Sequence, residues 1–171
     1  MDDDVDFVRD LFHTSYRRLV GQLTAVTGSH AEAEDAVQEA FVRAVDRSRA
    51  VRRTDNPEAW LRTVAVNVAR SRFRGDRRLV PLPKADAEGA ADLSPDHVAL
   101  MAGLNRLPAA QREAIALHHV ADLPVHEVAA LPRVPTGTVK ARLSRGRAAL
   151  AGLVSEHADD SHDEEVPRGR A

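Results

Sequence analysis

Four cations stand close together near the C-terminal end of the chain, on the stretch PTGTVKARLSRGRAAL that runs from residue 135 to residue 150. The stretch has no acidic residue, whereas the whole chain has a formal net charge of -2. On a helix, one narrow face of this stretch would be apolar and the opposite face would be slim. The apolar face holds Val139, Leu143, Gly146 and Leu150, the slim face holds Ser144 and Arg145, and Lys140, Arg142 and Arg147 flank it.

A helix with a slim face and cationic edges can enter the major groove of B-DNA, where the cations contact phosphates on the two walls. The sequence also predicts a short helix over 124–131 and a turn over 132–135 directly before it. A short helix, a turn and a second helix that reads bases form a helix-turn-helix. The alternative interpretation is a basic helix face that is merely solvated.

The elements that would position this predicted base-reading helix, the reader, are all helical. Two helix starts carry cap signals, Ser29 with an acid three residues later and Asn56 directly before a proline. Residues 48–55 lack periodicity and are expected to form a loop, and Val45 is placed on the apolar side of its helix. Apolar residues at helical spacing predict helices over about 7–26, 30–47, 57–74, 94–107, 108–120, 124–131 and 136–154.

These helices predict an all-α fold of two small helical domains, over residues 5–78 and 94–154. A flexible linker, 79–93, joins them, because this segment loses the periodicity and contains proline and glycine. Residues 155–171 hold six acids and are expected to form a disordered tail.

Composition removes several classes of function. The chain of 171 residues has no cysteine, which excludes disulfides, thiol catalysis and Cys-ligated zinc. His118, His119 and His126 could suggest a metal site, but adjacent histidines point about 100° apart on a helix. We expect no metal, no cofactor and no catalytic residue. The acidic start MDDDVD and the lack of a long apolar run predict a cytoplasmic protein without membrane insertion.

A second basic segment lies in the first half of the chain, over residues 43–78, with eleven Arg against four acids. This segment carries a local excess of positive charge, which says more about possible partners than the net charge of the whole chain does.

The chain resembles the extracytoplasmic-function (ECF) type of bacterial RNA polymerase sigma factor. The family's second region is matched by AEAEDAVQEAFVRA (31–44) and PEAWLRTVAVNVARSRFR (57–74). Its fourth region is matched by LNRLPAAQREAIALHHVADLPVHEVAALPRVPTGTVKARLSRGRAAL (104–150). The resemblance implies a subunit that binds the clamp and flap of core RNA polymerase, reads the -35 promoter element and melts the -10 element. An anti-sigma factor is a further candidate partner, because many relatives are restrained by one.

The resemblance assigns roles to three groups of residues. Asn67 matches an Asn that lines the pocket for a flipped base, and Trp60 is a candidate for stacking on a base or for the core. Arg145 is expected to read a base, with Ser144 as a weaker candidate. The -10 group is Arg49, Arg52, Arg53, Trp60, Asn67, Arg70 and Arg74; the -35 group is Thr136, Thr138, Lys140, Arg142, Ser144, Arg145 and Arg147; the polymerase group is Glu34, Asp35, Gln38 and Glu39.

Departures from the family pattern occur in the turn and in the reader. Pro132 and Arg133 stand where relatives usually have Leu and Gly, so Arg133 is expected to need a bent turn or to contact DNA. Gly146 replaces a common Ala, which costs about 1 kcal/mol in helix propensity but allows close packing. Alternatives are a stand-alone helix-turn-helix transcriptional regulator and a helical adaptor that binds only proteins.

Overall fold

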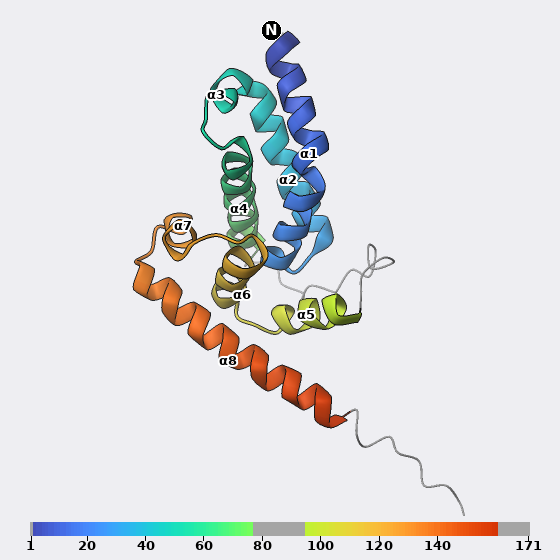
Figure 1. Cartoon of the computed structure of the whole chain (residues 1–171), viewed down its shortest axis with the longest axis vertical. Coiled ribbons are helices and arrows are strands. Elements are labelled where there is room, and N and C mark those ends of the chain that lie inside the picture. The colour runs from blue at the N-terminus through green and yellow to red at the C-terminus, as the bar shows by residue number, and fades with distance from the viewer. Residues whose placement is uncertain (1, 77–94, 161–171) are drawn as a thin grey trace, which may run out of the picture.

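The computed structural model describes residues 2–76 and 95–160, with side chains described for 3–72 and 97–153. Within these ranges the chain forms helices and short connections without a strand (Figure 1). The helices are α1 (Asp2–Thr27), α2 (His30–Asp46), α3 (Ser48–Arg52), α4 (Pro57–Asp76), α5 (Pro95–Asn105), α6 (Ala109–Ile115), the π-helix η2 (Ala116–Val120), α7 (Val125–Ala130) and α8 (Thr136–Asp160).

The first half of the chain is a bundle of α1, α2 and α4 with the short α3 across one end (Figure 1). Both predicted helix starts are confirmed. Ser29 Oγ accepts a hydrogen bond from the Glu32 N–H, and Asn56 Oδ1 accepts one from the Ala59 N–H at 3.0 Å. These caps satisfy N–H groups that a helix start leaves without partners. They fix where α2 and α4 begin.

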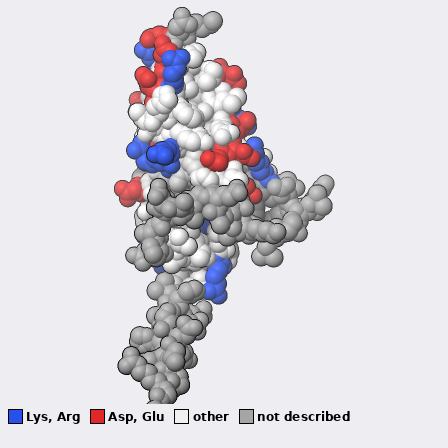
Figure 2. All heavy atoms as spheres, turned by 90° about the vertical axis from the view of Figure 1, so that its right-hand side faces the viewer, with Lys and Arg blue, Asp and Glu red and all other residues white. Residues whose placement is uncertain are grey.

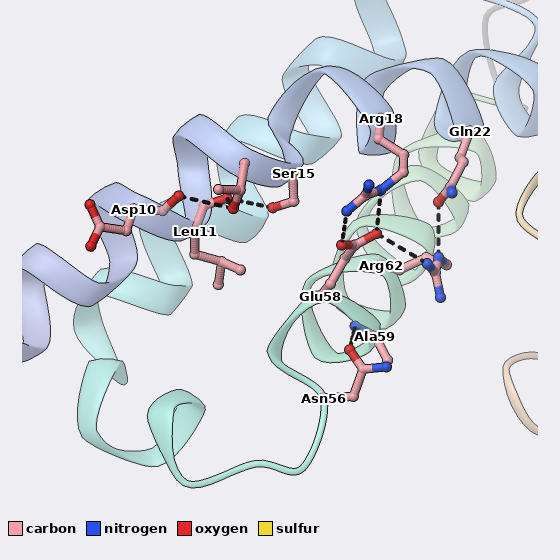
Figure 3. Close-up of polar contacts among 10 residues, drawn as sticks. Asp10, Leu11, Ser15, Arg18, Gln22, Asn56, Glu58, Ala59 and Arg62 are labelled. Atoms are coloured by element: carbon pink, nitrogen blue, oxygen red, sulfur yellow. Dashed lines mark hydrogen bonds and ion pairs between the residues drawn. The ribbon is translucent and has the colours of Figure 1, made fainter.

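Polar side chains hold α4 against α1 (Figure 3). Glu58 of α4 accepts hydrogen bonds from Arg18 of α1, with Nε–Oε1 at 2.9 Å. Its neighbour Arg62 donates from Nε to Gln22 Oε1 at 2.9 Å and contacts Glu58. The Arg62 side chain is 11% exposed, and its desolvation lowers the pKa of the guanidinium. This network fixes the axial position of α4 relative to α1.

The second half consists of four short helices and the long α8, and it packs on the first half. In Figure 1, α6 lies below α4 and α8 runs diagonally past the lower end of the molecule. α1 contacts both α6 and η2, and α8 packs on α6 and α7. Leu19 and Leu23 of α1 therefore belong to one buried cluster with Leu104, Ile115 and Leu117. The two halves share a continuous apolar core.

Four sequence predictions need correction. Residues 48–52 form α3 rather than a loop, because Val51 is fully buried and anchors a helical turn against α1. The helix expected over 108–120 widens into η2, where the Ala121 N–H bonds the Ala116 carbonyl five residues back. Val45 is 47% exposed, because the buried stripe of α2 ends at Ala44, one residue before it.

The fourth correction concerns the C-terminal segment. α8 continues to Asp160, so residues 155–160 are helical rather than disordered. Between Leu153 and Asp160 the sequence has no glycine or proline that would end the helix. The rest of the predicted tail, 161–171, and the predicted linker, 79–93, lie outside the described residues.

Candidate nucleic-acid interface

Helix α8, which contains the predicted reader, packs on α6 and α7 through its predicted apolar face. Val139 and Leu143 are 1% and 2% exposed, and Gly146 is buried against α6. A Cβ on Gly146 would stand 2.9 Å from Ile115 Cγ1, so only glycine allows this approach. The prediction that Gly146 permits close packing is confirmed.

The opposite face of α8 is open and positive. Lys140, Ser144, Arg145 and Arg147 are exposed, as is Thr136, while Thr138 and Arg142 are half-buried. Within the part of the chain that the structure describes, none of the four cations lies within 4.0 Å of an acidic oxygen. Cations without a protein carboxylate partner remain available for phosphates.

His119 lies next to this positive face. Burial lowers the pKa of His119, and the neighbouring His118 and Arg147 lower it further. The rings of His118 and His119 are 4.7 Å apart, and His118 Nδ1 lies 2.7 Å from the Leu123 carbonyl oxygen. Among the described residues, no group of three or more His, Cys, Asp or Glu is arranged to hold a metal ion.

The turn before α8 is bent at Arg133, as the departure from glycine predicts. Arg133 has a φ of 54°, in the left-handed region that costs a non-glycine residue about 1–2 kcal/mol. The Val134 N–H bonds the Ala129 carbonyl at 3.1 Å and closes the turn. Arg133 also faces an open hollow of about 380 Å³ that Asn67 lines from α4.

The -10 group does not form one free surface. Arg52 Nη1 donates to Asp3 Oδ2 at 2.6 Å and to Asp4 Oδ1 at 3.3 Å, and Arg49 Nε lies 3.9 Å from Asp4. Figure 2 shows acidic and basic side chains side by side at the end of the molecule where α1 begins. Arg53 is exposed beside them. The start of α1 thus competes for two of the predicted DNA contacts.

The remaining -10 residues lie along α4. Asn67 is exposed at the hollow, whereas Trp60 is half-buried and packs against the core. Arg70 is bonded to Glu113 of α6, with Nε–Oε2 at 2.9 Å, so its guanidinium is paired with a protein carboxylate. The physical reason is the packing of α6 near this end of α4. The side chain of Arg74 lies outside the described residues.

The predicted polymerase group lies on α2. Asp35 and Gln38 are exposed, while Glu34 and Glu39 are half-buried. Each has a neighbour: His30 for Glu34 at 3.5 Å, Arg72 for Asp35 at 3.1 Å, Tyr16 for Gln38 at 3.5 Å and Arg43 for Glu39 at 2.9 Å. Exposed pairs of this kind contribute little to stability, about 0–1 kcal/mol, so they can be exchanged for partner contacts.

Comparison with known proteins decides the family. A family model described as Sigma-70 region 2 matches residues 11–79, and one described as Sigma-70, region 4 matches residues 97–150. The ECF RNA polymerase sigma factor EcfG of Rhodopseudomonas palustris is 31% identical over 87% of this chain and 86% of its own. The chain belongs to the ECF sigma factors. Its two matched regions correspond to the two halves of the helical fold.

Two further comparisons agree with this. SigM of Mycobacterium tuberculosis is 30% identical over 84% of this chain and 75% of its own. The solved structure of the sigma factor RpoE with the anti-sigma factor NepR, from Bartonella quintana, matches with a TM-score of 0.74 and 28% identity. That match covers 88% of this chain and 97% of the solved one. No helix among the described residues is long and apolar enough to cross a membrane.

Sequence reasoning missed the acids that hold the predicted DNA-binding cations. Asp3 and Asp4 precede Arg52 by 49 and 48 residues, and Glu113 follows Arg70 by 43. The acidic run at the N-terminus is visible in the sequence, but only the packing of α1 on α3 reveals its target. Glu113 carries no local signal of its role.

Proposed function

We propose that this chain is a dissociable promoter-specificity subunit that binds core RNA polymerase, reads a -35 element with α8 and helps to melt a -10 element with α3 and α4. The observation that carries the proposal is the open cationic face of α8 on a chain that belongs to the ECF sigma factors. Sigma factors are not enzymes, and no bond chemistry is assigned to this one.

Roles within the reader follow from position. Arg145 lies on the exposed face opposite Val139 and Leu143, so its guanidinium reads a base, with guanine as the partner suited to a bidentate contact. Lys140, Arg142 and Arg147 contact phosphates, which contribute affinity and salt dependence without sequence information. Thr136 and Thr138 lie in the first turn of α8, where free N–H groups also hold a phosphate.

The partner surfaces follow from charge. The acid and amide face of α2 docks on the clamp of core polymerase, and the second half of the chain contacts the flap. The solved relative from Bartonella quintana is bound to an anti-sigma factor, so a protein of that kind is a candidate partner for this chain.

Transcription with purified core polymerase over a genomic library, with start sites mapped, tests the proposal. We expect promoter-specific starts only when this chain is present. Arg145→Ala should abolish starts that depend on the -35 element and leave core binding intact, whereas Arg9→Ala, an exposed cation of α1, should change neither. Unchanged promoter selection by Arg145→Ala would remove that residue from base reading.

Core binding tests the acidic face separately. Asp35→Arg should weaken affinity for core polymerase, while Asp10→Arg, an exposed carboxylate of α1, should not. Because the Asp35–Arg72 pair is exposed, its loss should barely alter the free energy of unfolding. A chain that binds promoter DNA tightly and never associates with core polymerase would instead be a stand-alone regulator.

A further inference from the structure

The turn between α7 and α8 closes with a pair of backbone hydrogen bonds that usually has a glycine at its centre (Figure 1). The Val134 N–H bonds the Ala129 carbonyl at 3.1 Å. The Arg133 N–H bonds the Ala130 carbonyl at 3.3 Å. These are the two bonds of a Schellman motif, in which the residue after the C-cap takes a left-handed conformation. Arg133 stands at that position, with a φ of 54°.

Arginine is an unfavourable residue for this position. Glycine adopts the left-handed region without a steric cost, whereas the Cβ of other L-residues comes too close to the following carbonyl oxygen. Asp122 also has a φ of 54°, but aspartate tolerates this region because its short polar side chain can bond nearby backbone groups. Arginine lacks such a short side chain. The chain therefore retains a cation at position 133 at a cost in stability.

The fold itself makes no use of this charge. Within the residues that the structure describes, the guanidinium of Arg133 forms no ion pair. The residue is exposed, although the acidic Glu127 lines the same hollow of about 380 Å³. The next residue, Val134, packs against the core and secures the turn. The turn thus depends on its backbone and on Val134, and the charge of Arg133 remains available for a partner.

The position of Arg133 indicates which partner this is. Like the four cations of α8, it is unpaired, whereas Arg18 and Arg52 of the first half are bound to acids. Arg133 lies three residues before Thr136, the first residue of α8. In a helix-turn-helix, the N-terminal residues of the second helix contact base edges in the major groove. A cation just before that end lies close to the wall of the groove, where the phosphates are.

We propose that Arg133 binds a DNA phosphate beside the -35 element, and that the strained turn is retained because it places a cation at the DNA backbone. The inference rests on the proposed function and adds to it a contact from outside α8. A phosphate contact contributes affinity and orientation without sequence information. Stability and DNA binding then favour different residues at position 133, glycine for the turn and a cation for the phosphate.

The salt dependence of binding gives the expected size of the effect. One phosphate contact contributes about 0.9 to the slope of log K against log salt concentration. A contact whose whole contribution is counterion release is therefore worth roughly eightfold in affinity at about 0.1 M salt, and almost nothing at about 1 M. The assay is binding of a fluorescent duplex promoter fragment by the full chain assembled with core RNA polymerase, over a series of salt concentrations.

Four variants separate the charge from the backbone conformation. Arg133→Gly should unfold at a higher urea concentration than the unaltered chain, yet bind roughly eightfold more weakly at about 0.1 M salt, with a slope lower by about 0.9. Arg133→Asn, which tolerates the left-handed region without a charge, should show the same loss of affinity. Arg133→Lys should keep the slope. Asp122→Gly is the matched control at the same φ and should not reduce affinity.

Fragments with different -35 sequences distinguish a phosphate contact from a base contact. A phosphate contact predicts the same fold loss for Arg133→Gly on every fragment, whereas Arg145→Ala should lose affinity mainly on the native element. A loss confined to one sequence would overturn the phosphate assignment. Unchanged affinity and slope in both Arg133→Gly and Arg133→Asn would overturn the contact itself. A lower urea midpoint for Arg133→Gly would show that the side chain stabilises the fold, and would overturn the explanation of the strained turn.

The proposed function is judged by the unaltered chain. If that chain directs no promoter-specific starts with core polymerase, the proposed function fails. The salt slope of the free full chain on the same duplex still tests the contact, because that measurement needs no polymerase. Promoter-specific starts combined with a slope that Arg133→Gly leaves unchanged would refute the contact alone.

Discussion

Two glycines of α8 offer a comparison in which the helix is the same and only the packing differs. Replacing a glycine by alanine inside a helix contributes about 1 kcal/mol of stability when the methyl group has room. Gly152 has nothing within 4 Å of the position of a Cβ, so Gly152→Ala should raise the free energy of unfolding by about that amount. The same gain is available at Gly146, but there the new Cβ would stand 2.9 Å from Ile115 Cγ1 and 3.3 Å from its Cδ1.

The cost at Gly146 outweighs that gain. Ile115 is 4% exposed and cannot swing into solvent, and overpacking of this kind costs about 1–3 kcal/mol. Gly146→Ala should therefore leave stability unchanged or lower it by up to about 2 kcal/mol. The two variants should differ by roughly 1–3 kcal/mol in urea unfolding followed by circular dichroism. Equal stabilisation by both would show that α8 does not lie this close to α6.

Three further predictions concern the charged and strained residues around the site. Asp3→Asn combined with Asp4→Asn should strengthen binding of single-stranded -10 DNA and steepen its salt dependence in fluorescence titrations, whereas Asp6→Asn should do neither. Arg133→Gly should raise the free energy of unfolding by up to about 1 kcal/mol in urea, because the left-handed φ is no longer strained; a loss would point to side-chain contacts of Arg133. The lowered pKa of His119 means that the folded chain binds fewer protons than the unfolded chain below pH 6.5, so stability falls as pH drops through that window. His119→Gln should flatten this fall in thermal unfolding, and an identical pH profile would contradict the assignment.

Local signals in the sequence were enough to predict most of the helices and the packing face of α8. Ser29 and Asn56 act through neighbours three residues away, so short-range chemistry defines those helix starts. Val45 was predicted wrongly, because an apolar side chain at the edge of a buried stripe has no local mark of being exposed.

The contacts that join distant parts could not be predicted in this way. Arg70 was placed in the -10 group, and the carboxylate that it binds in the structure lies 43 residues away. Arg112 looks like an ordinary surface cation of a polar helix, and only the docking of α6 on α1 explains its burial. Such pairings depend on tertiary packing.

The guanidinium of Arg112, which is bonded to the end of α1, affects the properties of the surface between the two halves of the fold. Desolvation lowers the pKa of Arg112, which means that this side chain gives up favourable hydration when the halves meet. If the two halves separated, water would hydrate both the guanidinium and the Val26 carbonyl, and the desolvation free energy would be recovered. An interface made only of leucines would expose apolar, aggregation-prone surfaces when opened. This interface would also expose polar groups that water hydrates.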